Sequence, residues 1–280
     1  MSRLSERARQ TSPFSPRLWD DKILNVTTSS GVPAFLAGIR LNPGRLRRLL
    51  AQYQPVSGQV CSSVFLRSGA ATAFLEGAGP EGIDWLERLS RLGNQVLKSD
   101  TGIAGLRAGQ TTLVVLPPFP LFENQLLTGW DPNSLLDVLE KEYTVGVVLL
   151  RLGRFSVAVY KGETLRASKT DARYVKGRHH AGGTSQKRFE RIREGQMHRI
   201  FDKACQTVHN QFAPWAGQIE YLLLGGERFT LDGFLKSCPE MKALRPITLA
   251  RRLNVRDPKR DTLPAVGSML RESRVWTIDW

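Results

Sequence analysis

The stretch Thr144 to Arg193 reads TVGVVLLRLGRFSVAVYKGETLRASKTDARYVKGRHHAGGTSQKRFERIR and contains the main clues to the fold. Three runs rich in β-branched and aromatic residues come first, at Thr144 to Leu152, Phe155 to Tyr160 and Glu163 to Thr170. Gly153 and Gly162 lie where tight turns would join these runs. The stretch therefore predicts an antiparallel meander of three strands.

The pattern changes after the third run. Residues 174–184 (YVKGRHHAGGT) contain three glycines and show no hydrophobic period, which is typical of a loop. From Ser185 apolar residues recur at helical spacing, and the expected buried side consists of Phe189, Ile192, Met197, Ile200, Ala204 and Val208. We therefore predict a glycine-rich loop that leads into a long helix.

The charge balance favours a partner that contains phosphate. Lys and Arg number 40 against 26 Asp and Glu, a formal net charge of +14, and a surplus of this size suits nucleic acid. Residues 151–210 hold 14 basic and 5 acidic residues, so a net charge of +9 surrounds the glycine-rich loop. The alternative is a charged surface that only keeps the protein soluble.

The loop and the helix start collect groups suited to chemistry on an RNA-linked ester. Glycines let backbone amides approach a ligand, and a helix N-terminus presents unpaired N–H groups with partial positive charge. The candidate catalytic residues are Gly182, Gly183, Thr184, Ser185 and Gln186. The candidate RNA-binding residues are Lys176, Arg178, His179, His180, Lys187, Arg188, Arg191 and Arg193.

Each group would act differently in ester hydrolysis. A backbone N–H aimed at the carbonyl oxygen that gains negative charge is worth about a hundredfold in rate. Gln186 is a neutral amide, so it would orient a water molecule rather than act as a strong base. On the residues alone, a flexible turn followed by a solvated helix face remains the alternative.

The order of three strands, glycine loop, basic helix, strand and Gly-Gly resembles the middle domain of the eukaryotic and archaeal class-one translation release factor. In that family a Gly-Gly-Gln loop enters the peptidyl transferase centre, and the next helix carries an Arg-Phe-x-Arg-x-Arg pattern. Residues 188–193 (RFERIR) match this pattern. The resemblance runs from Tyr143 to about Leu235 and implies an α/β (α+β) fold, a mixed sheet of ribonuclease-H-like topology with helices.

One spacing departs from the release-factor pattern. Aligned on the Arg-Phe pair without a gap, Thr184 takes the place of the glutamine, and Gln186 comes two residues later. The spacing Gly183-x-x-Gln186 is similar to the Vms-type release-factor-like branch, which acts on peptidyl-tRNA stalled on ribosomes. The resemblance therefore implies a peptidyl-tRNA hydrolase for ribosome rescue, with the family's glutamine at Gln186 and its glycines at Gly182 and Gly183. It leaves open whether the ester or a phosphodiester near the tRNA CCA end is cut.

The resemblance also implies the partners. These are the large ribosomal subunit and peptidyl-tRNA. The protein is expected to bind them in the cytoplasm as a monomer and to use no cofactor. The rival from another class is a non-catalytic RNA-binding or ribosome-associated module with the same basic surface. A metal-dependent nuclease is not favoured, because the meander offers only Glu163 as a strand carboxylate, and no metal is expected at the adjacent His179 and His180. A tRNA-modifying enzyme would need a cofactor pocket that no motif indicates.

Cysteine usage and apolar runs bear on the compartment. Cys61, Cys205 and Cys238 are far apart and include no CxxC pair, which points to a reducing compartment. Cys205 is expected on the buried side of the long helix, as part of the core. The longest apolar runs fall well short of the roughly 20 residues that span a bilayer, so no membrane segment is predicted.

The chain is long enough for two domains with separate cores. We expect a flexible basic tail at 1–17, a smaller mixed α/β domain at 18–116 that docks on ribosome or tRNA, a proline-rich linker at 117–131, and the release-factor-like catalytic domain at 132–280.

Shorter elements are expected within these two domains. In the first domain we expect helices at Pro43 to Tyr53 and Ile83 to Leu92, and strands at Val60 to Arg67, Ala71 to Glu76 and Thr111 to Leu116. In the second we expect a helix at Pro132 to Glu142, a strand at Glu220 to Leu224, a turn at Gly225-Gly226, a helix at Leu231 to Ser237 and a last strand at Val275 to Ile278.

Overall fold

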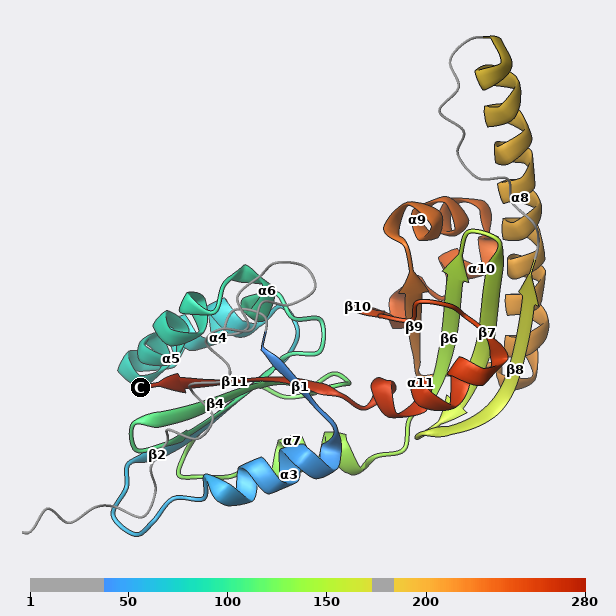
Figure 1. The fold of residues 1–280 in the computed structure, drawn as a ribbon. Helices are drawn as coiled ribbons and strands as arrows, with labels where there is room; N and C mark the ends of the chain where they lie inside the picture. Colours follow the sequence, from blue (N-terminus) through green and yellow to red (C-terminus); the bar gives the residue numbers. More distant parts are fainter. Residues whose placement is uncertain (1–37, 173–183) are drawn as a thin grey trace, which may run out of the picture. The chain divides into compact units, whose positions relative to one another are not determined.

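The computed structural model of the chain describes residues 38–172 and 184–280, and for residues 184–190 it describes the backbone alone (Figure 1). Residues Arg40–Trp280 form one compact unit. This unit contains two sheets, each accompanied by helices, so the predicted α+β fold class is confirmed. The predicted basic tail at residues 1–17 lies outside the described residues.

The first sheet has six strands in the order β1-β11-β4-β3-β2-β5. Its strands are β1 (Ile39–Leu41), β2 (Cys61–Leu66), β3 (Ile103–Ala108), β4 (Thr111–Leu116), β5 (Gln125–Thr128) and β11 (Ser273–Asp279). Near them in the chain come the helices α3 (Pro43–Gln52), α4 (Ala71–Gly77), α5 (Gly79–Arg91), α6 (Asn94–Leu97) and α7 (Asn133–Glu140). Leu75 of α4 and Trp85 and Leu89 of α5 are fully buried in one cluster with Val64 of β2 and Trp276 of β11.

The helices predicted at Pro43 and Ile83 and the strands predicted at Val60 and Thr111 are confirmed as α3, α5, β2 and β4. The strand predicted at Ala71 to Glu76 is wrong, because this segment forms α4. Alanine, leucine and glutamate are good helix formers, and the buried Ala71 and Leu75 lie four residues apart on one helical face. Trp85, rather than the half-exposed Ile83, anchors α5 in the core.

The stretch predicted as a linker, residues 117–131, contributes one strand to the first sheet. Gln125–Thr128 forms β5, which pairs antiparallel with β2. Phe119 and Leu121 are buried, and the Ser63 hydroxyl donates a 2.8 Å hydrogen bond to the Gly129 carbonyl. The prolines indicated a break in regular structure, but they do not show whether the residues after them pack, and here those residues supply an edge strand.

The last strand also belongs to the first sheet. The predicted strand at Val275 to Ile278 is confirmed as β11, but it pairs antiparallel with β4 rather than with the sheet of residues 144–172. Val275 faces Val115 and Trp276 faces Val114 in this ladder. The assignment of all residues 132–280 to the second domain is therefore corrected, since the chain returns to its first sheet.

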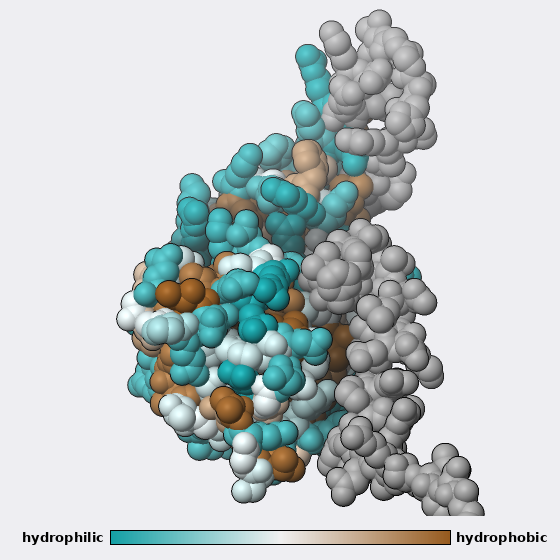
Figure 2. Space-filling model, turned by 90° about the vertical axis from the view of Figure 1, so that its left-hand side faces the viewer, coloured by the Kyte–Doolittle hydropathy of each residue, from teal (hydrophilic) through white to brown (hydrophobic). Residues whose placement is uncertain are grey.

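The outer face of the first sheet's helices is mixed in polarity. Figure 2 looks onto the side of the molecule where α4 and α5 lie in Figure 1, and it shows hydrophobic residues as small separate patches among hydrophilic ones. Scattered apolar side chains of this kind are ordinary on a protein surface. This view does not favour a partner that binds through a broad apolar face.

The second sheet has five strands in the order β10-β9-β6-β7-β8. Its strands are β6 (Thr144–Arg151), β7 (Arg154–Lys161), β8 (Thr164–Ala172), β9 (Tyr221–Gly226) and β10 (Thr248–Leu253). The helices that follow β8 are α8 (Thr184–Phe212), α9 (Arg228–Ser237), α10 (Pro239–Ala243) and α11 (Leu263–Leu270). The predicted meander is confirmed, because β6, β7 and β8 pair antiparallel in chain order. Its turns contain Gly153 and Gly162, whose φ angles of 89° and 59° suit glycine.

The strand predicted at Glu220 to Leu224 is confirmed as β9, but the turn predicted at Gly225-Gly226 is wrong. Both glycines continue β9, which pairs parallel with β6. A Cβ atom on Gly225 would lie 2.6 Å from Leu149 Cδ2, and one on Gly226 would lie 1.9 Å from the Leu150 carbonyl oxygen. The two glycines therefore allow a close approach of neighbouring strands, which has no local signature in the sequence.

Candidate functional site

The predicted site residues divide into three groups. Lys176, Arg178, His179, His180, Gly182 and Gly183 lie outside the described residues. Thr184, Ser185, Gln186, Lys187 and Arg188 have a described backbone, which is helical, and side chains outside the description. Arg191 and Arg193 are described in full. The roles assigned to all of them remain predictions.

The long helix begins where the sequence indicated. α8 starts at Thr184, one residue before the predicted start at Ser185. The first four N–H groups of any α-helix have no partner within the helix, and they carry a partial positive charge. Gln186 therefore lies in the first turn of α8, at a helix end whose backbone amides are suited to bind an anion or a developing oxyanion.

The first half of α8 extends past the sheet. Figure 1 shows α8 lying against β7 and β8 over its second half and continuing beyond the ends of these strands. The described residues from Arg191 to Arg199 are exposed or half-buried, and the first buried residue is Ile200. Ile192, predicted to be buried, is 41% exposed. At a rise of 1.5 Å per residue, the helix before Ile200 is about 24 Å long.

The second half of α8 anchors the helix to the sheet. Ile200, Ala204 and Val208 are buried, as predicted, together with Phe201 and Phe212. They share one cluster with inward-facing residues of the meander, Val148, Phe155, Val157 and Val159. Burying such side chains contributes about 1.5–3 kcal/mol each. The buried second half of α8 thus holds the helix against the sheet, and the predicted site lies at the N-terminal end of the helix.

The described part of α8 carries a basic surface. Arg191 and Arg199 are exposed, and Arg193 and Lys203 are half-buried. Among the described residues, none of these four forms an ion pair with a carboxylate, whereas Arg154 does. Unpaired guanidinium and ammonium groups on one helix suit phosphate contacts.

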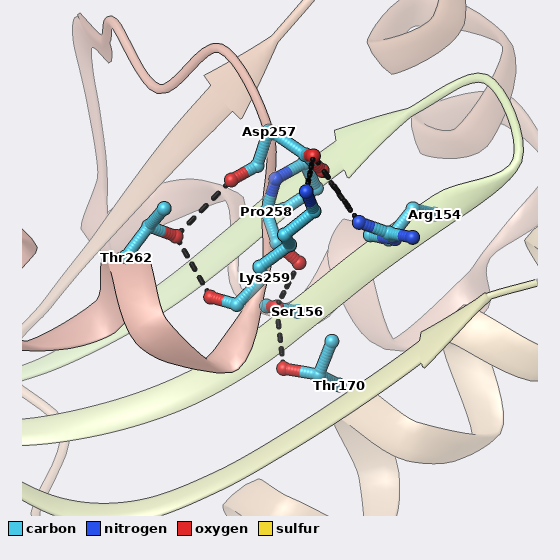
Figure 3. Close-up of polar contacts among 7 residues, drawn as sticks. All are labelled: Arg154, Ser156, Thr170, Asp257, Pro258, Lys259 and Thr262. Atoms are coloured by element: carbon cyan, nitrogen blue, oxygen red, sulfur yellow. Dashed lines mark hydrogen bonds and ion pairs between the residues drawn. The ribbon is translucent and has the colours of Figure 1, made fainter.

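A polar network holds the end of β8 from which the predicted loop departs. Arg154 of β7 faces Ala172, the last residue of β8, in the antiparallel ladder. Its guanidinium contacts the Asp257 carboxylate at 2.9 Å, and Lys259 Nζ contacts the same carboxylate at 2.9 Å (Figure 3). The segment after β10 is thereby fastened to β7, close to the start of the loop.

Hydroxyl groups complete this network. Ser156 Oγ donates to the Pro258 carbonyl at 2.8 Å and lies 2.7 Å from Thr170 Oγ1, which places Thr170 as the donor to Ser156 (Figure 3). The Thr262 hydroxyl lies 3.1 Å and 2.7 Å from the Asp257 and Lys259 carbonyl oxygens. Ser156 is fully buried, so its paired hydroxyl avoids the cost of an unsatisfied buried group.

Acid should weaken this network. The hydrogen bond from Lys259 and the charge of Arg154 hold the pKa of Asp257 below its usual value of 3.8. A carboxylate with a lowered pKa in the folded state stabilises the fold above its unfolded pKa, and this contribution is lost as the pH falls through the folded value. We expect Asp257→Asn to lower the thermal unfolding midpoint slightly at pH 7 and to have no effect well below pH 3.8. Thermal unfolding from pH 2 to 7 checks this, with Asp261→Asn as the control in the same segment.

The cysteines correct one interpretation of the sequence. Cys205 of α8 and Cys238, between α9 and α10, form a disulfide across 33 residues of sequence, and Cys61 is the free cysteine. The spacing of the three cysteines matches no short motif, so the sequence predicted no pairing among them. The pair forms only because α8 and the α9–α10 junction pack against the same core.

Within residues 38–172 and 184–280, no helix is both long and apolar enough to cross a bilayer.

Comparison with known families decides the relationship of the second sheet. Residues 143–276 match the family model of the Actinobacteria/chloroflexi VLRF1 release factor. The match covers 134 of the 280 residues, just under half of the chain. The VLRF1 segment contains the whole second sheet, α8 to α11 and the first residues of β11. The resemblance to a Vms-type release-factor-like family is thereby confirmed.

Curated relatives of the chain include archaeal release factors. The chain is 25% identical over 143 residues to peptide chain release factor subunit 1 of Archaeoglobus fulgidus, which covers 51% of this chain and 35% of the relative. It is 30% identical over 103 residues to the protein of that name from Methanosphaera stadtmanae, covering 37% of this chain and 25% of the relative. The chain therefore spans about a third or less of the length of these relatives.

Solved structures give a weaker likeness. The crystal structure of an archaeal translation termination factor aligns with a TM-score of 0.34 and 14% identity, covering 82% of this chain and 72% of that chain. The Thermoplasma acidophilum Pelota protein aligns with a TM-score of 0.24 and 10% identity, covering 80% and 60%. The family relationship rests on the sequence matches and not on these values.

Sequence reasoning missed two parts of the site's support. The Arg154–Asp257 pair was not predicted, since it joins residues about a hundred positions apart with no motif between them. β10 was also missed, because its sequence TLARRL does not alternate apolar and polar residues. Leu249 and Leu253 are buried, but Arg251 is the residue midway between them.

Proposed function

We propose that this chain is a release-factor-like peptidyl-tRNA hydrolase that frees nascent chains from stalled ribosomes. The observation that carries the proposal is the match of residues 143–276 to the VLRF1 family, together with a basic helix whose first turn contains Gln186. In this proposal the protein acts in the cytoplasm as a monomer and binds the large subunit and its peptidyl-tRNA. No cofactor takes part.

The proposed reaction is hydrolysis of the ester between peptide and tRNA. A water molecule oriented by Gln186 attacks the ester carbonyl carbon, and the bond to the tRNA ribose oxygen breaks. One proton of the water passes to the leaving ribose oxygen and the other is released to solvent, so the products are a peptide with a free carboxylate and a tRNA with an intact 3′ hydroxyl. Backbone amides of the Gly182-Gly183 loop and of the start of α8 would stabilise the oxyanion.

The basic surface of α8 would position the substrate. Arg188, Arg191 and Arg193 would contact phosphates of the tRNA acceptor end, and the buried second half of α8 would keep them on a rigid support. Precise placement of a reactant contributes to the rate in addition to the oxyanion contacts. The polar network at Arg154 would likewise help to position the substrate, because it holds the strand from which the predicted loop departs.

The decisive test uses isolated large ribosomal subunits that carry a stalled, labelled peptidyl-tRNA. We expect the full chain to release the peptide and to leave a tRNA whose sequenced 3′ end still carries CCA. Release of a peptide that is still joined to the CCA end, leaving a tRNA without CCA, would instead assign the chain to endonucleases. Binding to the subunits without either product would assign it to non-catalytic RNA-binding modules.

A further inference from the structure

Away from the predicted site, three residues with metal-ligating atoms meet where α8 packs beside α10, and His209 lies next to one of them, Glu240. Cys205 and His209 lie one turn apart on α8, Cys238 lies between α9 and α10, and Glu240 is in the first turn of α10. Residues four apart on a helix share one face, so Cys205 and His209 point to the same side. Cys205, Cys238 and Glu240 each offer a ligand atom within 4.8 Å of the other two.

The distances show how closely these atoms converge. Glu240 Oε2 lies 2.7 Å from Cys205 Sγ and 3.5 Å from Cys238 Sγ. The other oxygen of this carboxylate, Oε1, lies 3.7 Å from His209 Nδ1. Cys238 is fully buried, whereas the Glu240 side chain is 35% exposed and that of His209 is 64% exposed. The Cys238 side of the cluster is thus buried, and the side with Glu240 and His209 faces solvent.

In the disulfide form the two sulfur atoms have no proton to donate to the Glu240 carboxylate. A disulfide sulfur has no proton, and an ionised carboxylate accepts hydrogen bonds but donates none. Glu240 Oε2 and Cys205 Sγ therefore lie at hydrogen-bond distance with no hydrogen between them. Reduction would supply thiol protons, and a cation would neutralise all the electron-rich atoms together.

We propose that the reduced chain binds one Zn²⁺ ion through Cys205, Cys238, Glu240 and His209. Two thiolates, an imidazole and a carboxylate form a donor set that suits tetrahedral Zn²⁺. With Zn–S bonds of about 2.3 Å, the two sulfurs would separate to roughly 3.8 Å. The Cα atoms of the two cysteines are 5.4 Å apart, so side-chain rotation accommodates the change.

An entry path leads to the cluster. A surface hollow of about 1030 Å³ is lined by residues that include Cys205, His209, Ser237 and Glu240. Three of the four proposed ligand residues, Cys205, His209 and Glu240, line this hollow, so a hydrated ion and a small reductant can reach the cluster from this side. A candidate metal site needs such a path as well as suitable ligands.

Two exclusive states follow from this arrangement. A dithiol of the thioredoxin class transfers two electrons and two protons to the disulfide, gives two thiols, and is itself oxidised to a disulfide. Zn²⁺ then binds the two thiolates and displaces their protons. In the oxidised state a covalent bond ties α8 to the α9–α10 junction, and in the reduced state the metal does.

The test is metal binding by the 280-residue chain, purified metal-free and reduced with a phosphine, which lacks the thiolates that would themselves bind the metal. We expect the reduced chain to bind one Zn²⁺, and Co²⁺ in its place to give the strong near-ultraviolet absorption of thiolate coordination. The oxidised chain should show neither. Cys205→Ser and Cys238→Ser should abolish the cobalt absorption, and Cys61→Ser should leave it unchanged.

Two further variants guard against misfolding of the cysteine variants. His209→Ala and Glu240→Gln alter partly exposed side chains, and we expect each to weaken Zn²⁺ binding at least about tenfold with an unchanged circular dichroism spectrum. The proposal is overturned if the reduced wild-type chain binds no Zn²⁺, or if it binds as tightly in His209→Ala and Glu240→Gln as in the wild type. Because these readouts do not involve peptide release, they do not depend on the proposed hydrolase.

Discussion

Gln186→Ala is expected to lower the rate of peptide release from stalled large subunits by about a hundredfold or more, while the affinity for the subunits stays within about twofold. The substitution removes the amide that would orient the attacking water, and it leaves the basic surface of α8 intact. Alanine also suits a helix, so the backbone from Thr184 onward should be retained. Single-turnover release and a filter-binding titration on the same complexes measure the two quantities.

The matched control for this prediction is Gln206→Ala. Gln206 is exposed on the same helix, beyond the point where α8 reaches the sheet. Its substitution should change neither release nor binding. If Gln186→Ala releases the peptide at the wild-type rate, the role assigned to Gln186 is contradicted.

The arginines should respond in the opposite way. Arg188→Ala and Arg191→Ala are expected to weaken binding, because each would remove an interaction with a phosphate group. For single-stranded nucleic acid, the slope of log affinity against log salt should become less steep by about 0.7 for each phosphate that the variant no longer binds. A catalytic protein predicts that Gln186→Ala binds normally but does not release the peptide, and that the arginine variants bind weakly. These two results together would distinguish it from a non-catalytic RNA-binding module.

Gly226→Ala is expected to lower the free energy of unfolding by about 3 kcal/mol or more. Gly226 pairs with Leu150 in the parallel β6–β9 ladder, and an added Cβ would lie 1.9 Å from the Leu150 carbonyl oxygen. Its φ of 136° is also unfavourable for a residue with a side chain. Because β6 is in the middle of the sheet, the strands cannot move apart without breaking further pairs.

Chemical denaturation of the purified variants measures this effect. Gly195→Ala is the control, because a Cβ at Gly195 in α8 meets nothing within 4 Å. Alanine is about 1 kcal/mol more favourable than glycine in a helix interior, so this variant should be neutral or slightly more stable. Equal stability of Gly226→Ala and the wild type would show that β9 does not approach β6 as described.

The sequence alone determined the parts of this fold whose signals are local. The β6–β7–β8 meander was predictable because its strands are consecutive and are joined by two-residue turns that contain Gly153 and Gly162. The start of α8 was predictable because the hydrophobic period changes within a few residues of Ser185. The family relationship was predictable from RFERIR and the glycine loop, since these stand together in the chain.

Only the tertiary structure decided which distant segments meet. β11 pairs with β4, Cys205 meets Cys238, and Arg154 meets Asp257, across separations that no local period records. Side-chain patterns show that a segment is a strand or helix, but its partner depends on which sheet edge and which core surface remain free when the rest has folded. The close strand approach at Gly225-Gly226 is of this kind, because the atoms that require glycine belong to β6 and β10.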